Sequence, residues 1–252
     1  MKKHLLFCLF VGAFLASCKK EQVIISETET VIPRGQLKVS VKNEVNNTTL
    51  QLGQMLYTNN AGNQYRLDML KYYLSNFELI NENGASHKFG NFELIDHAKS
   101  ASQSFTLDSI PTGTYNKIKF LVGVDSITNQ TLNHPGDLDI SYGMFWSWST
   151  GYIFLKAEGA FIDSTGAEKP LIYHLGSNVA LSKVEIDITP ITIDKNTRNM
   201  NIRLDINKMF GVEEPLNFNF YNIQQSFPTG EERWIESMRT NLPNSFSLEF
   251  VQ

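Results

Sequence analysis

The chain has 252 residues and a formal net charge of −4, and so mild an acidic balance argues against nucleic acid as a partner. Both cysteines, Cys8 and Cys18, lie near the N-terminus. The rest of the chain therefore has no disulfide framework, no thiolate metal site and no cysteine nucleophile.

The first predicted segment, residues 1–17, is a lipoprotein signal peptide. A short basic start precedes an apolar run over residues 5–15, which is typical of a secretory signal and too short for a permanent membrane helix. The sequence LASC that ends at Cys18 resembles a bacterial lipobox, in which the signal is cut before the cysteine and that cysteine is acylated. We therefore expect an extracytoplasmic protein, lipid-anchored through Cys18 to the bacterial cell envelope, in the periplasm or at the outer membrane.

Residues 18–35 follow as the lipidated cysteine and a flexible tether. They are polar and repetitive in Glu and Thr, with one short apolar patch. Such a composition favours a linker that holds the folded domain away from the lipid surface. An additional edge strand is the alternative interpretation.

Residues 36–252 are predicted to form a single β domain, since no internal repeat or shift of composition divides them. Apolar and polar residues alternate with a period of two, as in half-buried strands, over 37–41, 118–122, 184–188 and 200–206. Asn-, Gly- and Pro-rich turns separate these runs. The fold class predicted is all-β, an antiparallel β-sandwich or Greek-key barrel with one or two short helices.

Two segments within this domain have mixed signals. Residues 66–80 place leucines at helical spacing, but a Tyr-Tyr pair and the Asn83-Gly84 turn after them favour a long strand. Residues 231–241 predict a helix, with acidic residues in the first turn and Trp234 and Met238 on one face.

The familiar catalytic motifs are missing. No G-x-S-x-G elbow, Gly-rich phosphate loop or H-x-x-x-H pair occurs in the sequence. A hydrolase built from Asp125, Asp137, Asp139 and Glu158 is a weak alternative, since only nearness in the chain connects these acids. We therefore predict a protein that is not an enzyme and has no catalytic residues.

The run GMFWSWSTGYIFLKAEG, residues 143–159, carries two of the three tryptophans. In an extended strand Met144, Trp146 and Trp148 point to the same face. His134 lies in the loop before this strand, and His174 lies near the end of another apolar strand. Imidazoles and a thioether are ligands that suit copper, in particular Cu(I), so His134, His174 and Met144 are candidate metal ligands, with Trp146 and Trp148 beside Met144 on the strand. An aromatic stripe in a hydrophobic core is the alternative.

Several segments together resemble the MbnP-like family of copper-binding proteins, which is associated with methanobactin and with copper handling in methanotrophs. They are MLKYYLSNFELI, IPTGTYNKIKFLVGVD, NHPGDL, GMFWSWSTGYIFLKAEG, YHLGS and LPNSFSLEF. The likeness extends from about residue 35 to 251, and W-S-W-x-x-G-Y-x-F is its most specific part. Within that family, the chain looks like a Bacteroidota-type lipoprotein member.

The resemblance implies a Greek-key-like β domain that binds a single copper ion, mostly as Cu(I), through histidines and a tryptophan oxidised to kynurenine. A dihaem cytochrome c peroxidase-like partner performs that oxidation in the family. Carried over, Trp146 or Trp148 would be modified, and His134 and His174 would supply imidazoles. Some members have a histidine two residues after the modified tryptophan, whereas Trp148 and Thr150 hold those positions here.

Two functions follow as hypotheses. The first is an extracytoplasmic lipoprotein that binds one copper ion for acquisition, storage or relay. The second is a non-catalytic surface β-sandwich that binds a polymer or a protein partner, with its aromatic residues as core or as a stacking platform.

Overall fold

The computed structural model describes residues 32–131, 134–147, 151–226 and 233–251. The predicted signal peptide, Cys18, most of the tether and Trp148 lie outside the described residues.

The first of two sheets has five strands over the described residues, in the order β15-β13-β1-β2 with β7 also beside β1. The central pair, β1 and β13, runs parallel, and the other pairs are antiparallel. At one end of β1, Asn46 and Asn47 both have positive φ, as a tight hairpin to β2 requires. The strands are β1 (Arg34–Val45), β2 (Thr48–Thr49), β7 (Ser104–Pro111), β13 (Thr197–Asp205) and β15 (Phe246–Val251).

The second sheet has ten strands in the described part of the chain, with the main order β12-β8-β4-β10-β11-β14. The shorter strands β3, β5 and β6 pair with β4, and β9 pairs with β10. Among the described pairs of this sheet, only β11–β14 is parallel. The strands are β3 (Tyr57–Thr58), β4 (Gln64–Asn81), β5 (Ser86–Lys88), β6 (Phe92–Asp96), β8 (Gly113–Val122), β9 (Phe145–Ser147), β10 (Gly151–Ile162), β11 (Glu168–Gly176), β12 (Ser182–Ile193) and β14 (Ile223–Gln225).

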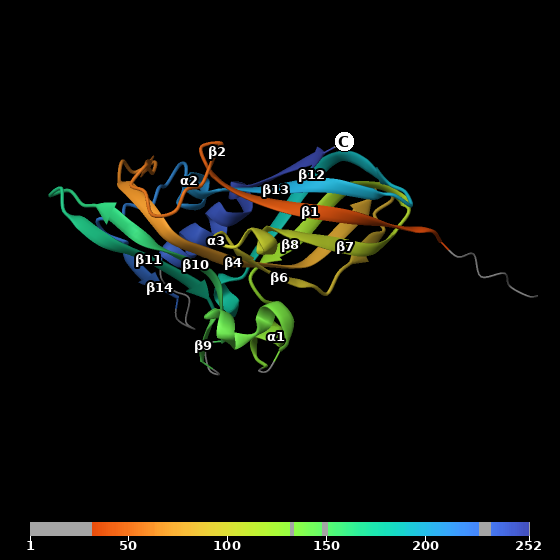
Figure 1. Ribbon diagram of the computed structural model, residues 1–252, viewed down its shortest axis with the longest axis horizontal. Helices are drawn as coiled ribbons and strands as arrows, with labels where there is room; N and C mark the ends of the chain where they lie inside the picture. The colour runs from red at the N-terminus through yellow and green to blue at the C-terminus, as the bar shows by residue number, and fades with distance from the viewer. Residues whose placement is uncertain (1–31, 132–133, 148–150, 227–232, 252) are drawn as a thin grey trace, which may run out of the picture. The chain divides into compact units, whose positions relative to one another are not determined.

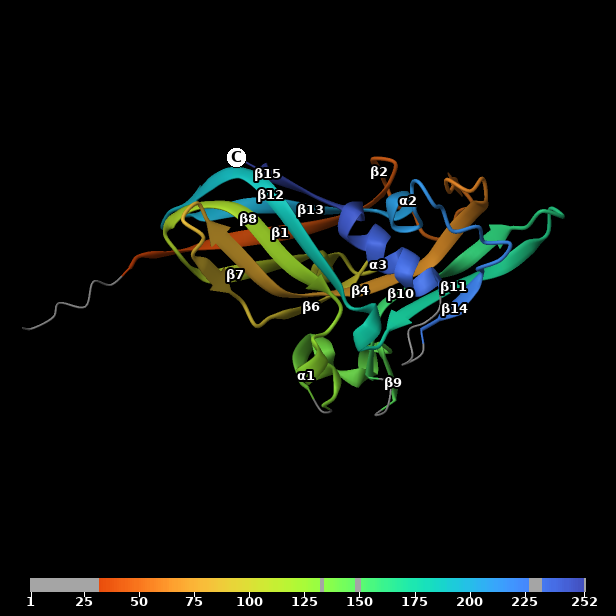
Figure 2. The ribbon, with the colours of Figure 1, turned by 180° about the vertical axis from the view of Figure 1, so that it is seen from behind.

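Three α-helices occur in the described ranges: α1 (Ser126–Asn129), α2 (Ile206–Met209) and α3 (Arg233–Ser245). Short 3-10 turns are η1 (Ser100–Gln103), η2 (Gly136–Leu138), η3 (Ile140–Tyr142) and η4 (Asn178–Ala180). Figure 2, the view from behind, shows α3 between the two sheets. There it packs against α2 and β12. Trp234 of α3 and Phe210 after α2 contact Tyr173, so the two helices cover the inner face of β11.

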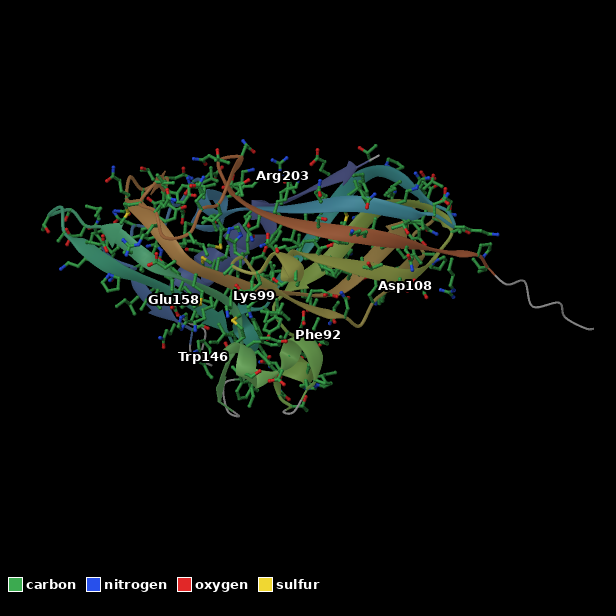
Figure 3. The ribbon with its side chains drawn as sticks, viewed as in Figure 1. Phe92, Lys99, Asp108, Trp146, Glu158 and Arg203 are labelled. Atoms are coloured by element: carbon green, nitrogen blue, oxygen red, sulfur yellow. The ribbon has the colours of Figure 1, made fainter. Side chains whose placement is uncertain are left out.

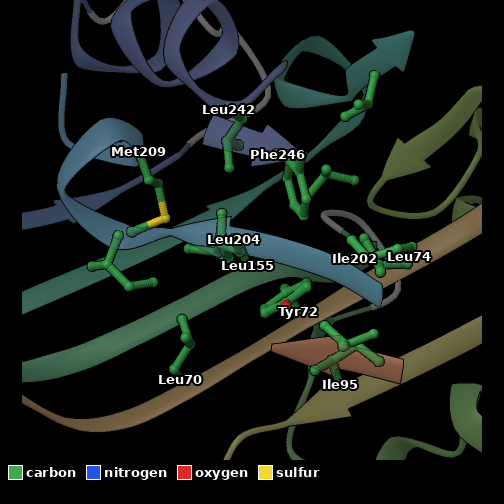
Figure 4. Packing of buried hydrophobic residues seen from close by; sticks show 14 of the residues in the cluster. Leu70, Tyr72, Leu74, Ile95, Leu155, Ile202, Leu204, Met209, Leu242 and Phe246 are labelled. Atoms are coloured by element: carbon green, nitrogen blue, oxygen red, sulfur yellow. The ribbon is translucent and has the colours of Figure 1, made fainter. Parts of the chain in front are cut away.

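The main core lies between the sheets and under these helices. Leu70, Tyr72 and Leu74 of β4 face Ile202 and Leu204 of β13 across it (Figure 4). All five are at most 1% exposed. These are the alternating residues of each strand, so the period-two pattern of the sequence marks the inner faces correctly.

A second core lies on the outer face of the large sheet. Residues 124–131 and 134–147 leave the sheet after β8 and fold back as a small lobe, visible as the α1 and β9 region in Figure 1. Its apolar side chains pack against Tyr73, which points away from the main core. We define the second core by its buried members: Tyr73, Leu94, Val124, Leu138, Met144, Tyr152, Ile153 and Phe154.

The all-β sandwich prediction is confirmed. The long strand predicted at 66–80 is β4 and the helix predicted at 231–241 is α3. Three points differ: each sheet contains one parallel pair, the described residues hold three α-helices rather than one or two, and the sheets do not close into a barrel. β1 begins at Arg34, so Arg34 and Gly35 belong to the sheet rather than to the tether.

Candidate metal centre

Trp146 and His174 lie side by side, although they are far apart in the sequence. β9 pairs with the start of β10, and β10 pairs with β11, so the β9–β10 hairpin delivers Trp146 to the end of β11. The two ring centroids are 6.4 Å apart and the ring planes are inclined by 47°. The structure therefore brings together one predicted tryptophan and one predicted histidine.

Gly176 makes room for the indole. A Cβ atom built on Gly176 would lie 2.7 Å from Cζ3 of Trp146 and 2.7 Å from the carbonyl oxygen of Tyr152. Only a residue without a side chain allows so close an approach. Ser226 fixes this strand end, since its hydroxyl donates to the Gly176 carbonyl and accepts from the Gly176 N–H.

His174 is held from one side by a carboxylate. Its Nε2 lies 2.7 Å from Oε1 of Glu158, and Nζ of Lys156 lies 3.4 Å from the same oxygen. The Nδ1 atom is buried and has no hydrogen-bond partner among the described residues. Figure 3 shows Glu158 and Trp146 on the same side of the molecule.

Burial and charge set the protonation of this pair. Burial lowers the pKa of His174 below its ordinary value, and this effect exceeds the raising effect of Glu158. Burial alone would raise the pKa of Glu158, but the hydrogen bond with His174 and the Lys156 ammonium outweigh it and hold that pKa below its usual range. At neutral pH the pair is thus a neutral imidazole and an ionised carboxylate.

This arrangement fits a metal-binding histidine. A neutral imidazole has one N–H and one lone pair, and the ionised carboxylate can accept only the N–H. The lone pair is then on the buried, unpartnered Nδ1. Metal-bound histidines commonly give their other nitrogen to a carboxylate in this way.

His134 lies elsewhere around the same hairpin. Its Nε2 is 2.7 Å from Oγ1 of Thr131, and its ring is 6.4 Å from that of Tyr152. Over the described residues, no aromatic contact joins His134 to Trp146 or His174. Thr131 precedes β9 in the chain and Tyr152 follows it, so His134 lies beside the segments that flank β9.

Met144, Trp148 and Cys18 are the other residues that the sequence analysis singled out. Met144 is 0% exposed and belongs to the second core, directly before β9. Trp148 and Cys18 lie outside the described residues. Within the described ranges, no group of three or more His, Cys, Asp or Glu side chains comes together as a metal site.

The acids considered for a hydrolase have other partners. Asp125 accepts the N–H groups of Ile127 and Thr128 and so caps α1. Asp137 accepts the N–H of Leu94, and Asp139 caps η3. Glu158 alone of the four contacts a predicted site residue.

Sequence reasoning missed the roles of Gly176, Ser226, Lys156 and Glu158 beside the rings. Strand alternation places Lys156 and Glu158 on one face, which is a signal in the sequence. Their nearness to His174 depends on the pairing of Lys156 with His174, which is a property of the fold.

The fold and the site define an all-β domain that sets a strand tryptophan beside a carboxylate-bound histidine. The family model named MbnP matches residues 34–227, so the chain belongs to the MbnP family, which is associated with copper. The solved structure of MbnP from Methylosinus trichosporium has the same fold, with a TM-score of 0.57 and 16% sequence identity. That match covers 88% of this chain and 100% of the other. No curated protein matches the chain.

Proposed function

We propose that the protein is an extracytoplasmic lipoprotein that binds a single copper ion, mostly as Cu(I), for acquisition, storage or relay, and that it catalyses no reaction. The observation that carries this proposal is the Trp146–His174 pair, with centroids 6.4 Å apart. Membership of a copper-associated family supports it. So does the buried Nδ1 of His174, which has no partner in the part of the chain that the structure describes.

Oxidation of the tryptophan would supply the ligand that an indole lacks. The indole N–H only donates, whereas kynurenine offers an aromatic amine and a ketone. The conversion cleaves the C2–C3 bond of the indole: two peroxide molecules each supply one oxygen atom and are reduced to water, and hydrolysis of the N-formyl group by one water molecule then releases C2 as formate. We propose a dihaem cytochrome c peroxidase-like protein as the catalyst. Trp146 is the preferred substrate because it lies beside His174.

The other predicted ligands belong to the same part of the chain. His134 precedes β9 and packs on Tyr152, which pairs with Phe145 of that strand. We retain it as the second imidazole. Met144 directly precedes β9, and its thioether, buried in the second core, is the remaining soft donor there.

The proposed location rests on the N-terminal sequence. Acylation of Cys18 would anchor the protein to the cell envelope, and residues 18–35 would hold the domain off the lipid. In the described ranges, none of the helices has the length and apolar composition to cross a membrane.

Intact-mass and peptide mass spectrometry test the proposal. The chain is expressed with and without the peroxidase-like protein encoded beside it, and its Cu(I) content is measured. We expect a mass change on the peptide containing Trp146, one bound Cu(I), and loss of both in Trp146→Phe. Trp148→Phe is the matched control and should keep both. Unmodified tryptophan together with no Cu(I) uptake would reject the proposal.

One observation favours a second candidate, a non-catalytic module that binds a polymer or a protein. Trp146 packs against the second core and is only partly exposed, as expected of a structural aromatic residue. In that case Trp146→Phe would lower the free energy of unfolding, and the wild-type chain would take up no copper.

A further inference from the structure

Glu158 lies on the outer face of β10, diagonally across from His174. Lys156 is the register partner of His174, and Glu158 follows it on the same face. Diagonal neighbours on adjacent strands are within reach of long side chains. The 2.7 Å distance from Oε1 of Glu158 to Nε2 of His174 is that of a charge-assisted hydrogen bond.

The carboxylate decides which nitrogen of His174 carries the proton. An ionised carboxylate can only accept, so Nε2 must donate. The second hydrogen bond of a neutral imidazole must then be made by the lone pair of Nδ1. That atom is buried without a partner among the described residues, and an unsatisfied buried acceptor opposes folding. A ligand at Nδ1 would remove this cost.

We propose that Glu158 is the positioning residue of the copper site, and that it presents Nδ1 of His174 as the ligand atom by holding the Nε2–H group. This inference rests on the proposed function and adds the identity of the ligand nitrogen. Lys156, with its ammonium 3.4 Å from the same carboxylate oxygen, restrains that oxygen. Carboxylates that accept from metal-bound histidines fix the ring orientation and raise the basicity of the ligand.

A surface ion pair is the competing explanation of Glu158. Its side chain is 32% exposed and that of Lys156 is 20% exposed, and such pairs contribute little to folding stability. If Glu158 served only as an ion pair, its replacement would change neither the tautomer of His174 nor the affinity for copper. The two explanations therefore differ in measurable properties.

The test compares the full-length wild-type chain with Glu158→Leu, Glu158→Gln and a control, Glu168→Gln. Glu168 lies on the same strand as His174 but pairs with Arg66, so its replacement leaves the imidazole untouched. Imidazole NMR at about pH 8, where a histidine is neutral, reports the tautomer of His174 in the metal-free protein. Competition with a Cu(I) chelator gives the affinity, and thermal unfolding confirms that each variant is folded.

We expect the wild-type protein and Glu168→Gln to carry the proton on Nε2 and to bind Cu(I) equally. Glu158→Leu should give a mixture of tautomers and an affinity lower by about 10–100-fold. Glu158→Gln should lose less, because its amide oxygen can still accept from Nε2. This variant also serves if Glu158→Leu does not fold.

Two results would overturn the proposal while leaving the proposed function intact. One is a wild-type His174 protonated on Nδ1. The other is a folded Glu158→Leu variant that binds Cu(I) as tightly as the wild-type chain. Failure of the proposed function has a different signature: the wild-type chain itself takes up no Cu(I), and the assignment of Glu158 to a copper site falls with it.

Discussion

Replacement of Gly176 by alanine is the most direct test of the site geometry. The added Cβ would lie 2.7 Å from Cζ3 of Trp146, and carbon atoms in contact prefer about 3.5–4.0 Å, so the indole edge must retreat by about 0.8 Å. The Tyr152 carbonyl oxygen, also at 2.7 Å, is backbone and has no rotamer to change. Crowding of this kind costs about 1–3 kcal/mol.

Gly113→Ala in β8 is the matched control. Both glycines lie in strands and neither has a positive φ, so alanine strains neither backbone. A Cβ on Gly113 meets nothing within 4 Å. The difference between the two variants therefore isolates the contact with Trp146 and Tyr152.

Urea unfolding of both variants measures the effect, and NMR contacts between the two rings report the position of Trp146. We expect Gly176→Ala to lose about 1–3 kcal/mol, to lose ring contacts between Trp146 and His174, and to bind less Cu(I). Gly113→Ala should stay within about 0.5 kcal/mol of the wild-type chain. If Gly176→Ala matched this control in stability and kept the ring contacts, the close packing described above would be wrong.

Three further predictions concern single residues. Ser177 has φ +65° and ψ 156°, a region that only glycine occupies freely, and its buried hydroxyl has no partner among the described residues. Ser177→Gly should therefore raise the free energy of unfolding in urea by about 1–3 kcal/mol, and a decrease would contradict this. The buried Tyr72 hydroxyl donates to Oδ1 of Asn43 at 2.6 Å. Tyr72→Phe should therefore lower the free energy of unfolding by about 1–3 kcal/mol in the same assay. An unchanged midpoint of urea unfolding would show that this hydrogen bond does not stabilise the fold. Copper binding needs neutral imidazole, and burial lowers the pKa of His174 from its ordinary value. Uptake should therefore persist at neutral pH and fall in acid as the imidazoles are protonated, and a chelator competition that stays flat from about pH 7.5 to about pH 5 would contradict histidine ligation.

Local sequence patterns predicted the elements of the fold because the order of apolar and polar residues within each segment reflects which of its faces is buried. β4 is the instructive case, since its middle, from Tyr72 to Ser75, is buried on both faces. A strand covered on both sides loses the simple alternation, and its leucines then also match a helical period. The Tyr-Tyr pair correctly favoured a strand. In the structure the two rings lie on opposite faces of β4, with Tyr72 in the main core and Tyr73 in the second core.

Strand partners could not be predicted in the same way. The parallel pairing of β1 with β13 joins residues from opposite ends of the domain, such as Leu37 and Arg198. Each strand alternates in the same manner whichever direction its neighbour runs. The antiparallel expectation was therefore correct for most pairs and wrong for β1–β13 and β11–β14.

The candidate site was predictable only in the part that depends on local residues, and not in the part that depends on strand pairing. Residue chemistry and family resemblance indicated Trp146 and His174 as members of one site. Glu158 could not be assigned to His174, because that contact depends on the β10–β11 register, which shifts between Ile153 and Leu155. A shift of one residue turns a side chain to the opposite face. If the register differed by one residue, Glu158 and His174 would lie on opposite faces of the sheet and could not contact each other.

The candidate site lies on the outer face of the large sheet, so the proposed metal binding would be separate from the packing that stabilises the sandwich. The hairpin that carries Trp146 packs on the second core, whereas the main core lies on the other side of β4. Burial of the main core drives folding of the two sheets whether or not Trp146 is modified. Oxidation of a tryptophan in the main core would place polar groups among Leu70, Tyr72 and Leu204, where they would be costly. Under the proposed function, oxidation of Trp146 would place an amine and a ketone beside His174 on the outer face, where they could bind the metal ion.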